Sequence, residues 1–343
     1  MPFDPLERRA IGKTQLTVTR MGLGGAPLGE RQVRVSDEQA NAIVQQAYAH
    51  GLRHFDTAPW YGQGKSELRM GRNLVDKPRT DFAVSTKIGR VFFRPAHPET
   101  FDPPWLGGGN RFDFRWDYSY DGVMRSYEDS LTRLGLNRVN MLLVHDIDPA
   151  FHGSWDGVDA RLKELDSGGG FRALEQLRRS GEIQAIGAGV NVTGMIPRFL
   201  KRFPMDFFLV AIPYTLLDQD VLDEEFPLMA EHGATAMIGA VLASGILATG
   251  PGPTAKYEYK IAPPAIQDRV AKMQLVCARH SVSLIAAALQ FPLAHPVVSS
   301  IIPGAFDVSH VTSNLADLRA AIPADFWSEL KAEKLIRADA PTP

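Results

Sequence analysis

From Val139 to His145 the chain reads VNMLLVH, a short and mostly apolar run that ends in a titratable side chain. Runs of this kind are typical of strands in a parallel sheet that is buried on both faces. Two more runs end in the same way, FAVSTK at Lys87 and HFD at Asp56, and Tyr61 follows in the next loop. Because the carboxyl ends of parallel strands meet at one edge, we expect these four polar side chains to lie together, and we call them the rim tetrad.

Strand-like runs alternate with segments of helical periodicity along the whole chain. Eight runs are each followed by a helix, which predicts a (β/α)8 barrel, with a doubly wound open sheet as the alternative. Residues 9–17 predict a hairpin that turns at Gly12 and Lys13 and plugs the bottom of the barrel. No linker or repeat is visible, so we expect residues 1–343 to form a single domain. The eight runs are Thr19–Gly24, His54–Asp56, Phe82–Lys87, Val139–His145, Ile183–Val190, Phe207–Ile212, Thr235–Ala240 and Val297–Ile302.

The charges are balanced, with 37 basic and 39 acidic residues and a net charge of −2, and neither sign forms a long run. This balance argues against nucleic acid and against an anionic membrane as partners. The start of the chain lacks the apolar core of a signal peptide, and the longest apolar stretch, Ala236–Ala243, is far shorter than the roughly 20 residues that span a bilayer. The single cysteine, Cys277, excludes an intrachain disulfide and fits the cytoplasm.

Three glycine-rich strings resemble nucleotide-binding motifs but lack an essential residue. Gly62–Ser66 ends in Gly-Lys-Ser, yet Pro59 stands where a phosphate loop needs its first glycine. Gly22–Pro27 and Gly187–Val192 both lack the last glycine of the dinucleotide fingerprint, so a Rossmann site is not expected.

Each tetrad residue also has a purely structural interpretation. Asp56 could cap the following loop or form a structural ion pair with Lys87, Tyr61 could be a packed aromatic, and His145 could be a core histidine. The string HDID that begins at His145 could suggest a metal site, but His54 is the only other strand histidine nearby, so no metal is expected.

Taken together, the tetrad residues have complementary proton chemistry. A tyrosine has a pKa of about 10 and is a poor base near neutral pH, but a nearby ammonium stabilises the phenolate. Lowering that pKa to about 7 requires roughly 4 kcal/mol, which a close and poorly solvated Lys87 could supply. Asp56 is placed to balance the charge of that lysine, and His145 could orient a substrate oxygen.

Long insertions follow three of the predicted strands and therefore belong to the rim where barrel active sites are built. They are Arg90–Asp117, Ile147–Asp166 and Ser244–Pro264, and the first contains seven aromatic residues. Because so many aromatics are poorly suited to water, we expect the rim loops to line a substrate pocket. The pocket residues that we predict are Trp60, Trp105, Phe112 and Trp116.

Several strings together resemble the aldo-keto reductase family. FDTAPWYG at Phe55–Gly62, STKIG at Ser85–Gly89, LLVHD at Leu142–Asp146 and IIPGA at Ile301–Ala305 occur in the family's order and span most of the chain. The resemblance implies a (β/α)8 barrel without a Rossmann domain and a nicotinamide cofactor that lies across the rim. It also implies that the rim tetrad is catalytic, with Tyr61 as the general acid or base.

The same resemblance assigns cofactor contacts to residues after the later strands. Asn191 matches the position that holds the nicotinamide amide, and the family's ring-stacking tyrosine falls at Gly239, for which Tyr214 could compensate. The pyrophosphate loop matches Ser244, Gly245 and Leu247, and the adenosine loop matches Pro303, Gly304, Ala305, His310 and Asn314.

The adenosine loop departs from the pattern of the NADPH-preferring members. Those members carry Lys, Ser and Arg where this chain has Gly304, Ala305 and His310. Without that cationic clamp a 2′-phosphate gains little to offset its desolvation. We therefore expect NAD as the cofactor and oxidation as the direction.

Longer strings, FRWDYSYDGV at Phe114–Val123 and GAGVN at Gly187–Asn191, resemble the aldose 1-dehydrogenase branch of the family. The resemblance implies oxidation of a cyclic hemiacetal to a lactone, with an aldose at C1 expected first and pyridoxal as the alternative small-molecule substrate. An NADPH-dependent carbonyl reductase, a non-catalytic cofactor-binding subunit and a Schiff-base aldolase acting through Lys87 are further alternatives.

Overall fold

The computed structural model describes residues 3–30, 33–105 and 108–343. Eight strands form one parallel sheet in which each strand pairs with the next along the chain. Parallel bridges join Met21 to Ile301 and Gly24 to Gly304, so the last strand returns to the first and the sheet closes. The barrel strands are β3 (Leu23–Gly24), β4 (His54–Asp56), β5 (Ala83–Ile88), β8 (Met141–Val144), β9 (Ala185–Val190), β10 (Phe207–Val210), β11 (Thr235–Ile238) and β14 (Val298–Ile301). The (β/α)8 barrel predicted from the sequence is confirmed.

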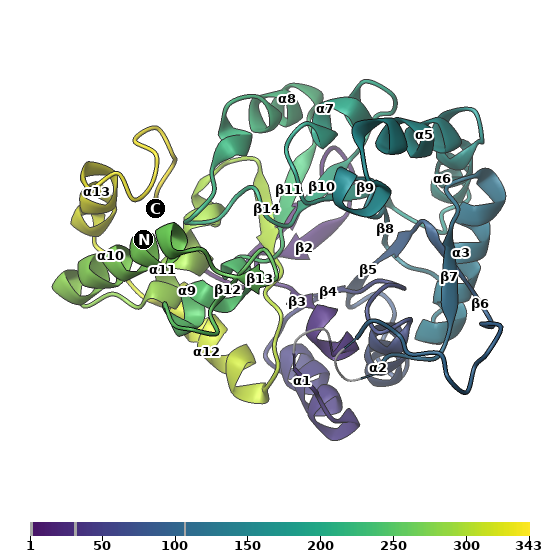
Figure 1. The fold of residues 1–343 in the computed structure, drawn as a ribbon, viewed down its shortest axis with the longest axis horizontal. Helices are drawn as coiled ribbons and strands as arrows, with labels where there is room; N and C mark the ends of the chain where they lie inside the picture. Colours follow the sequence, from purple (N-terminus) through teal and green to yellow (C-terminus); the bar gives the residue numbers. More distant parts are fainter. Residues whose placement is uncertain (1–2, 31–32, 106–107) are drawn as a thin grey trace.

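Helices surround the strands as an outer ring (Figure 1). The local sequence sets where they begin and end: Ser119 caps the first turn of α3 by accepting a hydrogen bond from the Gly122 amide, and Gly135 ends the helix at φ 64°. The ring consists of α1 (Asp37–Ala49), α2 (Lys65–Leu74), α3 (Tyr120–Leu134), α6 (Gly170–Arg179), α7 (Met195–Leu200), α8 (Glu225–His232), α10 (Pro264–His280), α11 (Leu284–Gln290) and α12 (Val308–Arg319). Short 3-10 helices η1 (Ala26–Gly29), η2 (Asp220–Leu222) and η4 (Phe291–Ala294), and the later helix α13 (Ala324–Ala332), complete this layer.

An antiparallel hairpin, β1 (Arg8–Ala10) and β2 (Thr17–Thr19), precedes the barrel. Its buried side chains Ile11, Leu16 and Val18 belong to the apolar cluster inside the barrel. Gly12 adopts φ 53° at the turn, where an added Cβ would lie 2.3 Å from a backbone oxygen, so only glycine fits there. The predicted hairpin is confirmed. Thr19, which was predicted to begin the first barrel strand, belongs instead to β2 of the hairpin.

The three insertions fold into short elements at the carboxyl rim. The first forms the hairpin β6 (Arg90–Phe93) and β7 (Asp113–Trp116), and the second forms α4 (Pro149–His152) and α5 (Trp155–Asp166). The third contains η3 (Ala243–Gly245), α9 (Ile246–Thr249) and the hairpin β12 (Lys256–Tyr257) and β13 (Lys260–Ile261). These elements cover the end of the barrel where the tetrad lies.

The helical periodicity of Ile266–Pro292 suggests one long helix, but this segment forms two helices, α10 and α11. The chain turns at Ser281, which has φ 56°, and Ser283 caps the new helix α11. Within the described part of the chain no single helix is long and apolar enough to cross a membrane; α10 and α11–η4 meet that test only as a pair bent by 102°.

Candidate active site

The register of two neighbouring strands places Asp56 beside Lys87. Asp56 ends β4 and pairs with Ser85 of β5, and Lys87 lies two residues further along on the same face. The Lys87 ammonium donates to both carboxylate oxygens of Asp56, at 3.0 and 2.9 Å, and to the carbonyl oxygen of Thr57 at 2.7 Å. Both side chains are buried, so each charge depends on the other for compensation.

A second layer of polar groups holds Asp56 from behind. The hydroxyl of Ser85 donates to Asp56 Oδ1 at 2.6 Å, and Nε2 of His54 lies 3.2 Å from that hydroxyl. Complete burial lowers the pKa of His54 to about 4, so its imidazole is neutral near pH 7. Because the Ser85 proton goes to Asp56, His54 is the donor to Ser85. His54 was not predicted as a site residue, although its spacing of two residues from Asp56 on one strand places both on the same face.

Tyr61 lies in the loop after β4 and faces both Lys87 and His145. The ammonium of Lys87 is 4.9 Å from the centre of the Tyr61 ring, and the His145 ring lies edge-on to it with centroids 6.0 Å apart. Gly29 permits this placement, because a Cβ there would lie 2.4 Å from the Tyr61 backbone. The structure thus brings all four residues of the predicted tetrad together.

His145 follows β8 and contacts a buried ion pair. Its Nδ1 is 3.3 Å from Nη1 of Arg90, and its Nε2 is 3.4 Å from Oδ1 of Asp146. Arg90 in turn pairs with Asp146 at 2.7 Å. Burial alone would raise the pKa of the Asp146 carboxyl, but its interactions with His145 and with the Arg90 guanidinium outweigh it and hold that pKa below its usual value. Neither Arg90 nor Asp146 was predicted as a site residue.

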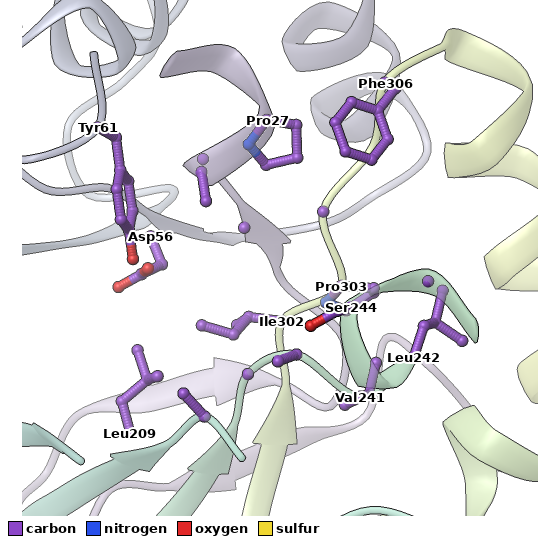
Figure 2. A pocket seen from close by; sticks show the side chains of 18 of the residues that line it. Pro27, Asp56, Tyr61, Leu209, Val241, Leu242, Ser244, Ile302, Pro303 and Phe306 are labelled. Carbon is purple, nitrogen blue, oxygen red and sulfur yellow. The ribbon is translucent and has the colours of Figure 1, made fainter. Parts of the chain in front are cut away.

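Two cavities meet at the tetrad. The first, which we call the glycine groove, has about 940 Å³ of empty space including its open mouth, and Figure 2 shows Tyr61 and Asp56 at one end of it, with Leu242 and Phe306 at the other. The second, the tetrad cavity, has about 1210 Å³ and is lined by Tyr61, Lys87 and His145. Tyr61, Leu209, Ala211 and Tyr259 line both, so the two cavities adjoin at these side chains.

The glycine groove is bounded mainly by backbone and small side chains. A Cβ on Gly24 would lie 2.6 Å from the carbonyl oxygen of Ile302, and one on Gly304 would lie 2.5 Å from Pro27, so glycine is what lets these segments approach each other. Among the described residues that line the groove, Asp56 is the only charged one. A long groove with exposed backbone and a proton donor or acceptor at one end fits an extended dinucleotide whose reactive ring lies next to Tyr61.

The predicted cofactor residues divide into two groups. Ser244, Gly245, Pro303 and Gly304 line the glycine groove, and Asn191 lines the tetrad cavity. Asn191 donates to Asp148 Oδ2 at 2.8 Å and to Asp146 Oδ1 at 3.3 Å. Three further predicted contacts, Leu247, Ala305 and Asn314, are buried and line neither cavity, and His310 is exposed on α12 with its ring against Phe306.

The structure contradicts the stacking role suggested for Tyr214. Its side chain is fully buried and lines neither cavity. It packs against Phe226, Phe291 and His295, with the Phe226 ring centroid 4.8 Å away. An aromatic already enclosed on these sides has no face to offer to a ligand.

Of the aromatics predicted to form a substrate pocket, only Trp60 lines the tetrad cavity. Trp105 packs behind Trp60 at 4.9 Å, Trp116 lies over Arg90, and Phe112 is 46% exposed and stacked on Phe92. The hairpin β6–β7 thus uses its aromatics to enclose an arginine. The residues that do complete the cavity include Phe151, Asp148 and Lys260, from insertions whose folds the sequence pattern did not predict.

The family model of the "Aldo/keto reductase family" matches residues 20–334. The chain is 41% identical to the pyridoxal 4-dehydrogenase of Microbacterium luteolum, over 98% of this chain and 100% of that protein. It is 37% identical to a D-threo-aldose 1-dehydrogenase of Pseudomonas sp, over 97% and 98%. The holo form of an aldo-keto reductase from Bacillus halodurans superposes with a TM-score of 0.74 at 25% identity, covering 98% of both chains.

Proposed function

Because the chain belongs to the aldo/keto reductase family, whose members bind a nicotinamide cofactor, we propose that it oxidises a cyclic hemiacetal to a lactone with NAD. The observation that carries this proposal is the position of Tyr61, which lies where the two cavities join and faces the buried Lys87. A proton acceptor at that junction can serve a substrate in the tetrad cavity while the glycine groove holds the cofactor.

In this mechanism Tyr61 removes the proton of the anomeric hydroxyl. Lys87, held by Asp56 and Thr57, places a positive charge next to the ring and stabilises the phenolate form that acts as base. Asp56 keeps that ammonium in place, and Ser85 and His54 keep Asp56 in place. His145 donates a hydrogen bond to the same substrate oxygen and fixes its direction toward Tyr61. Ser244, Gly245 and Gly304 of the glycine groove would hold NAD, which when bound would supply the acceptor for the hydride that leaves C1. The proton passes from Tyr61 to solvent.

The preference for NAD rests on the charge of the glycine groove. A 2′-phosphate carries close to two negative charges and needs cationic partners to offset its desolvation. No Lys or Arg occurs among the described residues of the groove lining, and the position of the family's arginine is His310, whose Nδ1 accepts a hydrogen bond from the Phe306 amide. An unphosphorylated ribose has no such requirement.

Two substrate classes contain the functional group that this site would oxidise, a cyclic hemiacetal. An aldose of the L-fucose type is the first, supported by the D-threo-aldose relative, and pyridoxal is the second, supported by the pyridoxal relative. The tetrad cavity offers aromatic surfaces from Trp60 and Phe151 and polar groups from Asp148 and Lys260. Aromatic faces suit either a sugar ring or a pyridine ring.

The test is the initial rate of NADH formation with L-fucose, D-arabinose, L-galactose and pyridoxal, each with NAD and with NADP. We expect turnover of at least one of them with NAD, and at least a tenfold preference for NAD, or about 1.4 kcal/mol. The Tyr61→Phe variant, which lacks the proposed proton acceptor, serves as the negative control. No oxidation of any of the four, together with efficient NADPH-dependent reduction of simple aldehydes, would establish the carbonyl reductase instead.

A further inference from the structure

Arg90 is buried beside the site but lines neither cavity. It follows Gly89, which adopts φ 117° and where an added Cβ would lie 2.2 Å from the Tyr118 ring. This turn, available only to glycine, takes the chain from β5 into β6 at the rim and brings the Arg90 guanidinium to His145 and Asp146.

Aromatic rings enclose the guanidinium of Arg90. Its central carbon is 4.0 Å from the centroid of Trp116, 4.3 Å from Trp60, and 5.2 Å from both Phe114 and Phe151. Among the described residues Nε and Nη2 have no hydrogen-bond partner, so these atoms face π surfaces. The aromatic rings therefore fix the position of the guanidinium. Its Nη1 atom makes the polar contacts with Asp146 and His145.

The contact with His145 has one chemically consistent form. A guanidinium is always protonated and can only donate, so the Nδ1 atom that it approaches at 3.3 Å has to be the acceptor. The neutral imidazole then carries its proton on Nε2, which lies 3.4 Å from the Asp146 carboxylate, and the His145 side chain lines the tetrad cavity. The other tautomer would oppose N–H to N–H at Arg90 and lone pair to carboxylate at Asp146. Both neighbours therefore favour the same form.

We propose that Arg90 is a positioning residue that fixes His145 as the neutral Nε2–H tautomer, so that the imidazole presents a hydrogen-bond donor to the substrate oxygen. Asp146 is the counterpart that holds Arg90 there. It has φ 57°, a left-handed conformation that Asp tolerates better than most residues, and this turns its carboxylate back toward Arg90 and His145. The consequence for turnover rests on the function proposed above, but the tautomer does not.

The test is the imidazole ¹⁵N spectrum of the free protein labelled at histidine, with the His145 signal assigned from a His145→Gln variant. In the wild-type protein we expect an unprotonated Nδ1 and a protonated Nε2. In Arg90→Met we expect averaged nitrogen signals from exchanging tautomers, and in Arg90→Lys, which keeps a donor, substantial recovery of the wild-type pattern. The His54 signal serves as an internal control in every sample.

Two further variants separate this effect from damage to the fold. Arg90→Met leaves Asp146 without its cation, so Arg90→Met/Asp146→Asn removes both charges, and it should fold and still show averaged His145 signals. Arg133→Met removes another arginine that is packed on a ring, Phe92, and paired with a buried carboxylate, that of Glu67, without contact to His145. It should leave the His145 signals unchanged.

On a substrate that the wild-type enzyme turns over, Arg90→Met should lower kcat/KM by up to about 100-fold, while the affinity for NADH stays within about twofold. A His145 signal that keeps its Nε2–H tautomer in both Arg90→Met and the double variant would overturn the proposal. So would a lost tautomer with unchanged kcat/KM. If no substrate is found, the proposed function fails while the spectrum still decides the tautomer.

Discussion

The two sides of the barrel rim are built on opposite principles. The side of β4, β5 and β8 buries the pair Asp56–Lys87 and the pair Arg90–Asp146, each closed at 2.9 Å or less. The side of β11 and β14 presents small or apolar residues such as Gly239, Gly245 and Gly304 to the groove, and no cation among those described. Buried ion pairs hold their atoms in fixed positions, whereas glycine residues, which have no side chain, leave room for a ligand in the groove.

This difference divides the work of the proposed enzyme. Proton transfer requires groups held within a fraction of an ångström, and the interlocked ion pairs provide that order. Binding of a long cofactor requires an open groove. Glycine backbone can line such a groove closely, whereas larger side chains would fill it. Changes on the first side should therefore affect chemistry and stability, and changes on the second should affect cofactor choice.

The largest expected effect is that of Tyr61→Phe, which removes the proton acceptor and little else. We expect kcat to fall by about 10²- to 10⁴-fold, because that is the usual contribution of general acid–base catalysis, with NADH affinity unchanged. Steady-state rates and a fluorescence titration of NADH measure the two. Tyr120→Phe, which removes a hydroxyl bound to Gln176 outside both cavities, is the control. A loss of NADH binding as large as the loss of turnover would contradict the proposal that the tetrad side serves chemistry and the groove side serves cofactor binding.

Lys87→Met should cost stability as well as activity. It leaves the Asp56 carboxylate buried without its cation, and breaking a buried pair in this way costs about 3–5 kcal/mol. In Lys87→Met/Asp56→Asn most of that loss should be recovered, while activity stays lost. Urea denaturation gives the free energies of unfolding. Equal stabilities for the single and double variants would show that the pair is not coupled.

The neutral, buried His54 predicts how the charged side responds to acid. The pKa of His54 is about 4 in the folded protein and 6.5 without burial. As the pH falls below 6.5, this histidine therefore becomes protonated in the unfolded chain while it is still neutral in the folded protein. The stability that this histidine supports is complete above pH 6.5 and is lost as the pH falls toward 4, by about 3 kcal/mol for a difference of about 2.5 units. In His54→Gln the free energy of unfolding should fall less between pH 7 and 4. The exposed His232→Gln should behave as wild type, and identical pH profiles for all three proteins would contradict the assignment.

The smallest predicted effect is a gain on the glycine side. His310→Arg places a cation on the exposed first turn of α12, where NADPH-preferring members of the family carry theirs. We expect NADP to bind about tenfold more tightly, or about 1.4 kcal/mol, and NAD to be unaffected. Equilibrium titrations of both cofactors measure this, with His232→Arg on α8 as the control. No change in NADP affinity would mean that the groove excludes the phosphate by shape.

The sequence predicted the barrel, its hairpin plug and the meeting of the tetrad, because alternating apolar runs fix which strand ends share a rim. It did not reveal Arg90, since a lone arginine in a loop has no periodicity and its partner Asp146 depends on a left-handed turn. Trp116 and Phe112, predicted as pocket residues, line neither cavity for a related reason. Composition shows that aromatics must pack, but the hairpin register decides what they pack against.

The most direct test of the central claim is the stoichiometry of a single oxidation. The substrate that turns over fastest is incubated with excess NAD, and NADH is followed by absorbance while the organic product is identified by mass spectrometry. Our account predicts one NADH for each lactone formed, a lactone two hydrogens lighter than the substrate, and formation of both products at least about 100-fold more slowly with Tyr61→Phe. Formation of NADH and lactone at an undiminished rate by Tyr61→Phe would contradict it.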